Sequence, residues 1–180
     1  MAAIVQLPTE DILCLDFEAS ALGPGSYPIE VAVADCQSTL CTSWLIRPTD
    51  EWRAEGIWSE QASDVHQITL SDLTTHGQAP ELVAQELGYL CKGKTILCDG
   101  GDHDWRRLVT LFSSINEPPP FKLSNYSSFA WELASRLGRR PEIAVRRSEL
   151  EALSRFPILH RAEPDARRLA EVVRLLAGHP

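Results

Sequence analysis

Two acidic residues, Asp16 and Glu18, stand two positions apart at the end of the apolar run 12–15. Such a run predicts a strand buried on both faces, and because side chains alternate along a strand, both carboxylates project from one face. Burying two like charges is costly unless a cation offsets them. Mg²⁺ and Mn²⁺ prefer oxygen ligands of this kind. The pair is therefore a candidate metal site, unless the strand leaves the core here and both acids are hydrated.

A third acid, Asp165, lies near the start of a predicted helix whose apolar stripe is Leu169, Val172, Val173 and Leu176. Asp165 precedes Leu169 by four residues, so it falls on the same face, one turn earlier. A charge at the head of a core-facing stripe needs a partner or a metal. The alternative is an acid that favours the helix start through the macrodipole.

The segment 99–104 holds three acids in a glycine-rich turn before a predicted helix. N-capping explains one such aspartate, and the pattern alone leaves Asp102 and Asp104 as competitors. Turns of this type after a strand are also where open α/β sheets bind ligands. His160 precedes Asp165 by five positions; an isolated histidine is more often structural, but its usual pKa near 6.5 suits the removal of a proton from water.

The elements that would position these residues follow from apolar periodicity and turn residues. Residues 50–72 are expected to be irregular with short helical turns, and 139–147 to be a basic connector before a short helix at 149–154. The sequence predicts strands over 12–17, 29–34, 39–46, 94–98 and 121–125, and helices over 80–90, 104–112, 127–137 and 164–177. The first three strands suggest an antiparallel meander, and the whole order suggests an α/β fold with a mixed sheet and helices on its faces.

The chain has 180 residues and a net charge of −8, and we expect one domain spanning 1–180. The negative charge argues against a protein that coats nucleic acid by neutralising many phosphates. It does not argue against an enzyme that grips a short single-stranded end. No membrane helix or signal peptide is expected, and the five scattered cysteines suggest reduced thiols, so we expect a cytoplasmic protein.

Taken together, the motifs resemble those of the DEDDh group of 3′-5′ exonucleases, which includes proofreading exonuclease subunits, ribonuclease T and oligoribonucleases. The D-x-E motif is matched by 16–18, the helix-opening aspartate by Asp104, and H-x-x-x-x-D by 160–165. The segment 65–69, V-H-Q-I-T, resembles a V-H-G-I-T segment found in many members. The resemblance spans essentially the whole chain.

The resemblance implies a ribonuclease H-like fold with a mixed five-stranded sheet flanked by helices. It also implies two-metal hydrolysis of phosphodiester bonds at single-stranded RNA or DNA 3′ ends, releasing nucleoside 5′-monophosphates. Two divalent cations, Mg²⁺ or Mn²⁺, would be held by Asp16, Glu18, Asp104 and Asp165, and His160 would be the general base. The substrate would be bound by the Phe17 backbone, Ala19, Leu22, His66, Arg106 and Arg107. Relatives acting on small RNAs are often homodimers, so a homodimer is one expected form.

The sequence departs from the group at two places. Residues 19–21 replace a threonine-containing run, and 99–103 replace a histidine–asparagine segment, so extra acids lie beside the expected site. Three alternatives stay open. One is a DNA proofreading exonuclease subunit, which would be expected to carry a polymerase-binding tail. Another is a non-catalytic nucleic-acid- or protein-binding module that retains the fold. The third is an unrelated α/β protein whose acids are placed by chance.

Overall fold

A computed structural model describes residues 9–178, so the N-terminal segment 1–8, expected not to be a signal peptide, lies outside the described residues. The five strands are β1 (Ile12–Ala19), β2 (Pro28–Asp35), β3 (Cys41–Leu45), β4 (Thr95–Cys98) and β5 (Leu123–Asn125). They form one sheet in the order β3-β2-β1-β4-β5. The pairs β1–β2 and β2–β3 are antiparallel, whereas β1–β4 and β4–β5 are parallel. The predicted mixed five-stranded sheet and its initial meander are confirmed.

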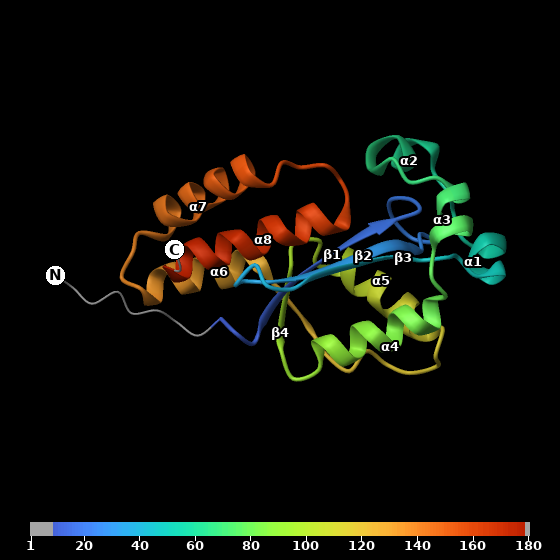
Figure 1. Cartoon of the computed structure of the whole chain (residues 1–180), viewed down its shortest axis with the longest axis horizontal. Coiled ribbons are helices and arrows are strands. Elements are labelled where there is room, and N and C mark those ends of the chain that lie inside the picture. The colour runs from blue at the N-terminus through green and yellow to red at the C-terminus, as the bar shows by residue number, and fades with distance from the viewer. Residues whose placement is uncertain (1–8, 179–180) are drawn as a thin grey trace.

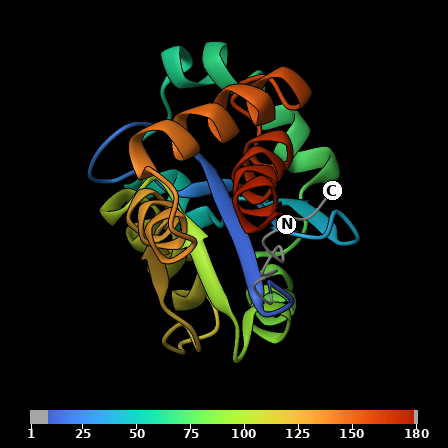
Figure 2. The same cartoon turned by 90° about the vertical axis from the view of Figure 1, so that its left-hand side faces the viewer.

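Helices cover both faces of this sheet (Figures 1 and 2). On one face lie α6 (Tyr126–Arg136), α7 (Pro141–Arg155) and α8 (Ala162–Ala177), and on the other lie α4 (Pro80–Cys91) and α5 (Asp102–Ser113). Three short helices, α1 (Asp50–Glu55), α2 (Glu60–His66) and α3 (Leu70–His76), gather where β1 ends (Figure 1). Among the described residues, no helix has the length and apolar character needed to cross a membrane.

Strand alternation divides the core into two main layers. Leu13, Leu15 and Phe17 of β1 pack towards α4 and α5, so Cys14, Asp16 and Glu18 face the side of α8. Small residues dominate that side: Cys14, Ala32 and Ala34 from the sheet meet Ala166 and Ala170 of α8. Small residues let a helix approach a sheet closely, and this approach brings the first turn of α8 over the end of β1.

Two predicted segments need correction. Residues 50–72 contain two defined helices and the start of a third, α3, and each helix is preceded by a Thr or Ser N-cap whose hydroxyl accepts a backbone N–H hydrogen bond. The predicted connector 139–147 and short helix 149–154 are wrong, because Pro141–Arg155 is one continuous helix. Pro141 occupies its first turn, where a missing N–H costs nothing. Arginine is a good helix former, so the basic stretch extends the helix instead of linking two elements.

Candidate active site

Three of the predicted carboxylates converge on one point. Asp16 and Glu18 come from β1 and Asp165 from the first turn of α8, and one oxygen of each lies within 4.8 Å of the others. Asp165 is buried, whereas Asp16 and Glu18 are partly exposed. The pairing register of β1 with β2 shifts between Glu18 and Ala19. Irregularities of this kind re-aim side chains and are common beside functional sites.

Asp104 is also buried, at 1% exposure, but its carboxylate is occupied within its own helix turn. Its Oδ2 accepts a hydrogen bond from the Gly100 backbone N–H at 3.0 Å, and its Oδ1 accepts one from Arg107 at 3.1 Å. A Cβ on Gly100 would overlap both carboxylate oxygens in this position of Asp104, so glycine lets the carboxylate lie against the turn. Among the described residues, Asp104 is outside the three-carboxylate group, although its charge acts on Asp16. The competitor Asp102 is exposed.

The electrostatics of the group disfavour three bare charges. Burial raises the pKa of Asp16 well above its usual value, and neighbouring carboxylates, with Glu18 the foremost, raise it further. Burial likewise raises the pKa of Glu18 to about 7, with Asp165 as the largest charged contributor. Arg107 and Arg161 act in the opposite direction on Glu18, but burial and the neighbouring acids prevail.

The donor set fits a divalent cation. Oxygen donors from Asp and Glu are the ligands that hard divalent cations prefer, and a bound cation offsets the mutual repulsion that raises these pKa values. Asp16, Glu18 and Asp165 could hold one such ion through the converging oxygens. Arg168 forms an ion pair with Asp165, and Arg107 forms one with Asp104, so part of the negative charge is already balanced.

His160 lies in the loop between α7 and α8, exposed to solvent, with a backbone φ of 50° in the left-handed region. Histidine is among the few non-glycine residues enriched there. Its side chain borders a groove of about 600 Å³ that also reaches Glu18. Leu22 stands at the groove with 87% of its surface exposed. The groove is lined by Glu18, Ala19, Ala21, Leu22, Ile57, Ser59, Gln61, Ala62, Val65, His66, Arg107 and His160.

The predicted substrate-binding residues are only partly brought together. Ala19, Leu22, His66 and Arg107 line the groove, whereas Arg106 is exposed and does not border it. Phe17 is buried towards the opposite face of the sheet. Its side chain therefore does not face the groove, and only its backbone could contact a substrate, as the resemblance implied.

His66 is buried at 2% exposure, so little of its surface is open to a substrate. Its Nδ1 accepts a hydrogen bond from the Ile68 backbone N–H at 3.0 Å, which leaves the proton of the neutral ring on Nε2. Burial lowers the pKa of His66, while the charge of Glu30 acts in the opposite direction. Nε2 is buried without a hydrogen-bond partner among the described residues, so the ring lines the groove with one polar atom free.

The sequence reasoning missed one residue beside the site, Glu30. This acid of β2 is 3% exposed and is the register partner of Glu18 across the β1–β2 pair. Its carboxylate binds Arg161 and the Ala162 backbone N–H at the start of α8. The available signal was a single acid inside an otherwise apolar predicted strand, 29–34.

No protein-family profile and no curated protein matches the sequence. Solved structures do match in fold. E. coli exonuclease I in complex with a dA16 oligonucleotide is 15% identical, with a TM-score of 0.65 over 91% of this chain and 40% of that chain. A zinc-bound complex of E. coli exonuclease I with single-stranded DNA is 15% identical, with a TM-score of 0.63, covering 91% of this chain and 39% of that chain.

A 3′-exonuclease that recognises the histone mRNA stem-loop shows the same likeness. It is 14% identical, with a TM-score of 0.61, and the match covers 93% of this chain and 64% of that chain. The chain thus spans between 39% and 64% of the length of these three solved structures. The likeness confirms the ribonuclease H-like fold that the motifs implied.

Proposed function

We propose that this chain is a divalent-metal-dependent 3′-5′ exonuclease that hydrolyses single-stranded ends and releases nucleoside 5′-monophosphates. The observation that carries the proposal is the convergence of Asp16, Glu18 and Asp165, of which Glu18 lines a groove that His160 also borders. Carboxylates, a histidine and an open groove are the parts that metal-assisted phosphodiester hydrolysis requires. The shared fold with solved exonucleases supports the same conclusion.

Each part has a chemical task in this proposal. Two Mg²⁺ or Mn²⁺ ions would activate water and stabilise the departing 3′-oxygen. Asp16, Glu18 and Asp165 would hold these ions, and Asp104 would join them by turning from Arg107. His160 would take the proton from the attacking water, since it is exposed and borders the groove beside Glu18.

The groove suits an unpaired end better than a duplex. Leu22, Ile57 and Val65 offer exposed apolar surface on which bases of any sequence can stack. Ser59 and Gln61 add uncharged polar groups near this surface, and such groups can read a 2′-hydroxyl. We therefore propose RNA as the favoured substrate, with DNA ends as a weaker one.

A substrate panel tests this function. Purified protein is incubated with 5′-labelled RNA and DNA oligonucleotides of several lengths, single-stranded and duplex, in Mg²⁺, Mn²⁺ or EDTA. We expect a ladder shortened from the 3′ end, faster for single-stranded RNA, and none in EDTA. Asp16→Ala should abolish the ladder, and His160→Ala should slow it by about 100- to 10,000-fold. A parent protein that degrades long duplex DNA but spares single strands contradicts the proposal.

A second candidate function, a non-catalytic nucleic-acid-binding module, is favoured by the arginine pairs. Arg107 and Arg168 neutralise Asp104 and Asp165 without any metal. This candidate predicts that oligonucleotides bind equally well in EDTA and in Mn²⁺ and are not cleaved. Asp16→Ala would then leave binding unchanged.

A homodimer is also part of the proposal. Trp131 is 52% exposed and Trp105 is 40% exposed, and large apolar side chains left on a surface often mark a contact between proteins. Light scattering at increasing protein concentration measures the mass directly. A particle of 20.0 kDa at every concentration would contradict self-association.

A further inference from the structure

Glu30 is an acid buried inside the sheet, directly beside the candidate site. It lies on β2 opposite Glu18, and paired residues of antiparallel strands present their side chains on the same face. That face is the one covered by α8. Only 3% of Glu30 is exposed, so an ionised carboxylate at this depth must be matched by donors.

The donors come from the segment that joins α7 to α8. Arg161 donates Nε to Oε2 at 3.0 Å and a terminal nitrogen to Oε1 at 2.7 Å, and the Ala162 backbone N–H donates to Oε2 at 2.9 Å. A two-point arginine–carboxylate pair fixes orientation as well as distance. Arg161 occupies the N-cap position of α8, where its own side chain makes no capping bond. Glu30, on β2, therefore caps the N-terminus of α8 by accepting the Ala162 backbone N–H.

The anchored residues lie between His160 and Asp165. His160 immediately precedes Arg161, and Asp165 is in the first turn of the helix that Ala162 begins. The left-handed backbone of His160 turns the chain sharply just before Arg161. The position of both side chains thus depends on where Glu30 holds Arg161 and Ala162.

We propose that Glu30 is a positioning residue, which rests on the exonuclease function proposed above: it locks 160–165 onto β2 so that His160 faces the groove and Asp165 reaches Asp16 and Glu18. A displacement of about 1 Å in a catalytic group can cost about 100-fold in rate. The hydrogen bonds of Glu30 go to Arg161 and Ala162, and not to Leu22 or Val65, the groove residues that would stack on bases.

The test is Glu30→Gln, which keeps the shape and removes the charge. We expect kcat on a single-stranded oligonucleotide to fall about 10- to 100-fold, because the proton acceptor is misplaced. KM should stay within about 3-fold, because the apolar groove is unchanged. Hydrogen exchange should quicken over 158–165 in the same variant.

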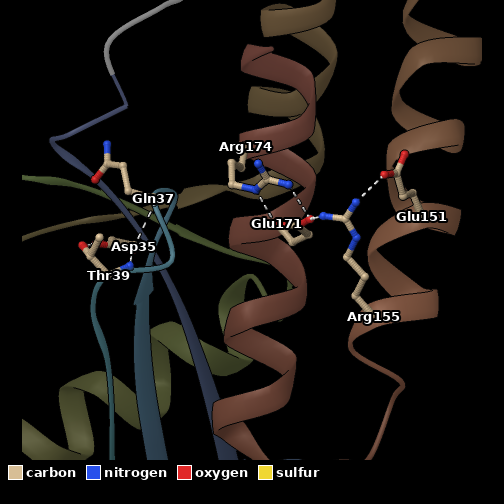
Figure 3. Close-up of polar contacts among 7 residues, drawn as sticks. All are labelled: Asp35, Gln37, Thr39, Glu151, Arg155, Glu171 and Arg174. Atoms are coloured by element: carbon tan, nitrogen blue, oxygen red, sulfur yellow. Dashed lines mark hydrogen bonds and ion pairs between the residues drawn. The ribbon is translucent and has the colours of Figure 1, made fainter. Parts of the chain in front are cut away.

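Glu171→Gln is the matched control. Glu171 is a buried acid on the same α8, at 4% exposure, and it also binds two arginines. Arg155 and Arg174 surround it (Figure 3), with Arg174 Nε at 2.7 Å. The control removes an equivalent charge from the same helix, away from its N-terminal turn. It should leave kcat within about 3-fold of the parent at a temperature where both are folded.

A double-mutant cycle of Glu30→Gln with Arg161→Ala tests whether Glu30 acts through Arg161. If Glu30 acts through Arg161, the double variant should lose no more than the larger single loss, because coupled residues are not additive. Unchanged kcat in Glu30→Gln, or equal losses in Glu30→Gln and Glu171→Gln, would overturn the inference. A parent protein without nuclease activity would contradict the proposed function. The positioning inference would then be contradicted if amide hydrogen exchange over 158–165 is the same in Glu30→Gln and the parent.

Discussion

At the scale of single residues, the site carries a stability cost that metal binding would relieve. The pKa of Glu18 is raised to about 7 by burial and by Asp165. An acid whose folded pKa exceeds its unfolded value binds a proton more tightly in the folded state. Its neutral form is therefore tolerated below about pH 4.5, and stability is lost as pH rises towards about 7.

We therefore predict that Glu18→Gln stabilises the metal-free protein at pH 8 by roughly 1–3 kcal/mol and has little effect at pH 4.5. Chemical denaturation of parent and variant in EDTA measures the difference. With Mn²⁺ the order should reverse, because the parent gains a ligand that the variant lacks. Equal stability differences at both pH values would contradict the raised pKa.

Leu22 is a second residue whose exposure needs a reason. With 87% of its surface in solvent, it contributes almost nothing to the core. We predict that Leu22→Ala raises KM for single-stranded substrates about 5- to 150-fold, corresponding to a stacking loss of about 1–3 kcal/mol per base. Leu82→Ala is the control, because Leu82 is also exposed, at 45%, but lies on α4 outside the groove. An equal KM in both variants would remove Leu22 from the substrate site.

How far the sequence could predict these residues depends on how local each signal is. Asp16 and Glu18 are two residues apart, and Asp165 shares a helix face with its apolar stripe, so periodicity paired the first two and placed the third towards the core. The resemblance to the DEDDh group was needed to bring all three into one site. Asp102 and Asp104 could not be separated, since both open the same helix; burial now distinguishes them. Glu30 was missed because its partner Arg161 is 131 residues away in the chain.

At the scale of elements, prediction succeeded where apolar periodicity was strong. The sheet and α4, α5, α6 and α8 begin and end within about two residues of the predicted bounds. The helix α7 was misread because it buries little beyond Ser148 and Ala152. With so few buried positions, its apolar pattern was too weak to show a continuous helix. Its regularity comes from helix-forming residues and from packing against α8.

The turn between β2 and β3 shows how one side chain can fix an element. Asp35 accepts hydrogen bonds from the backbone N–H groups of Gln37 and Thr39, at 3.2 and 2.9 Å, and from the Thr39 hydroxyl (Figure 3). It also accepts one from the Leu40 backbone N–H at 3.0 Å. We predict that Asp35→Ala lowers the free energy of unfolding by about 2–4 kcal/mol, because several donors lose a charged acceptor. Denaturant titration measures this loss. Unlike Glu30→Gln, the folded variant should retain the kcat of the parent.

At the scale of the whole molecule, the charge distribution favours binding of a short nucleic-acid end over binding along a whole strand. The chain carries 17 basic and 25 acidic residues. Many arginines are paired internally, including Arg136 with Glu132 and Arg155 with Glu151. Near the groove, Arg107 lines the wall, while Arg106 of the same helix is exposed. Few cations of the groove lining are therefore available to phosphates.

This balance predicts a shallow salt dependence. If about two or three phosphates are neutralised, log KM for a single strand should rise with log salt at a slope of about 1.4–2.1. KM should then rise by about 7- to 18-fold between 50 and 200 mM NaCl at fixed Mn²⁺. A protein that contacts 6–10 phosphates of a single strand would lose about 300- to 16,000-fold over the same range. A loss of that size here would mean that a broad cationic surface, and not the apolar groove, holds the substrate.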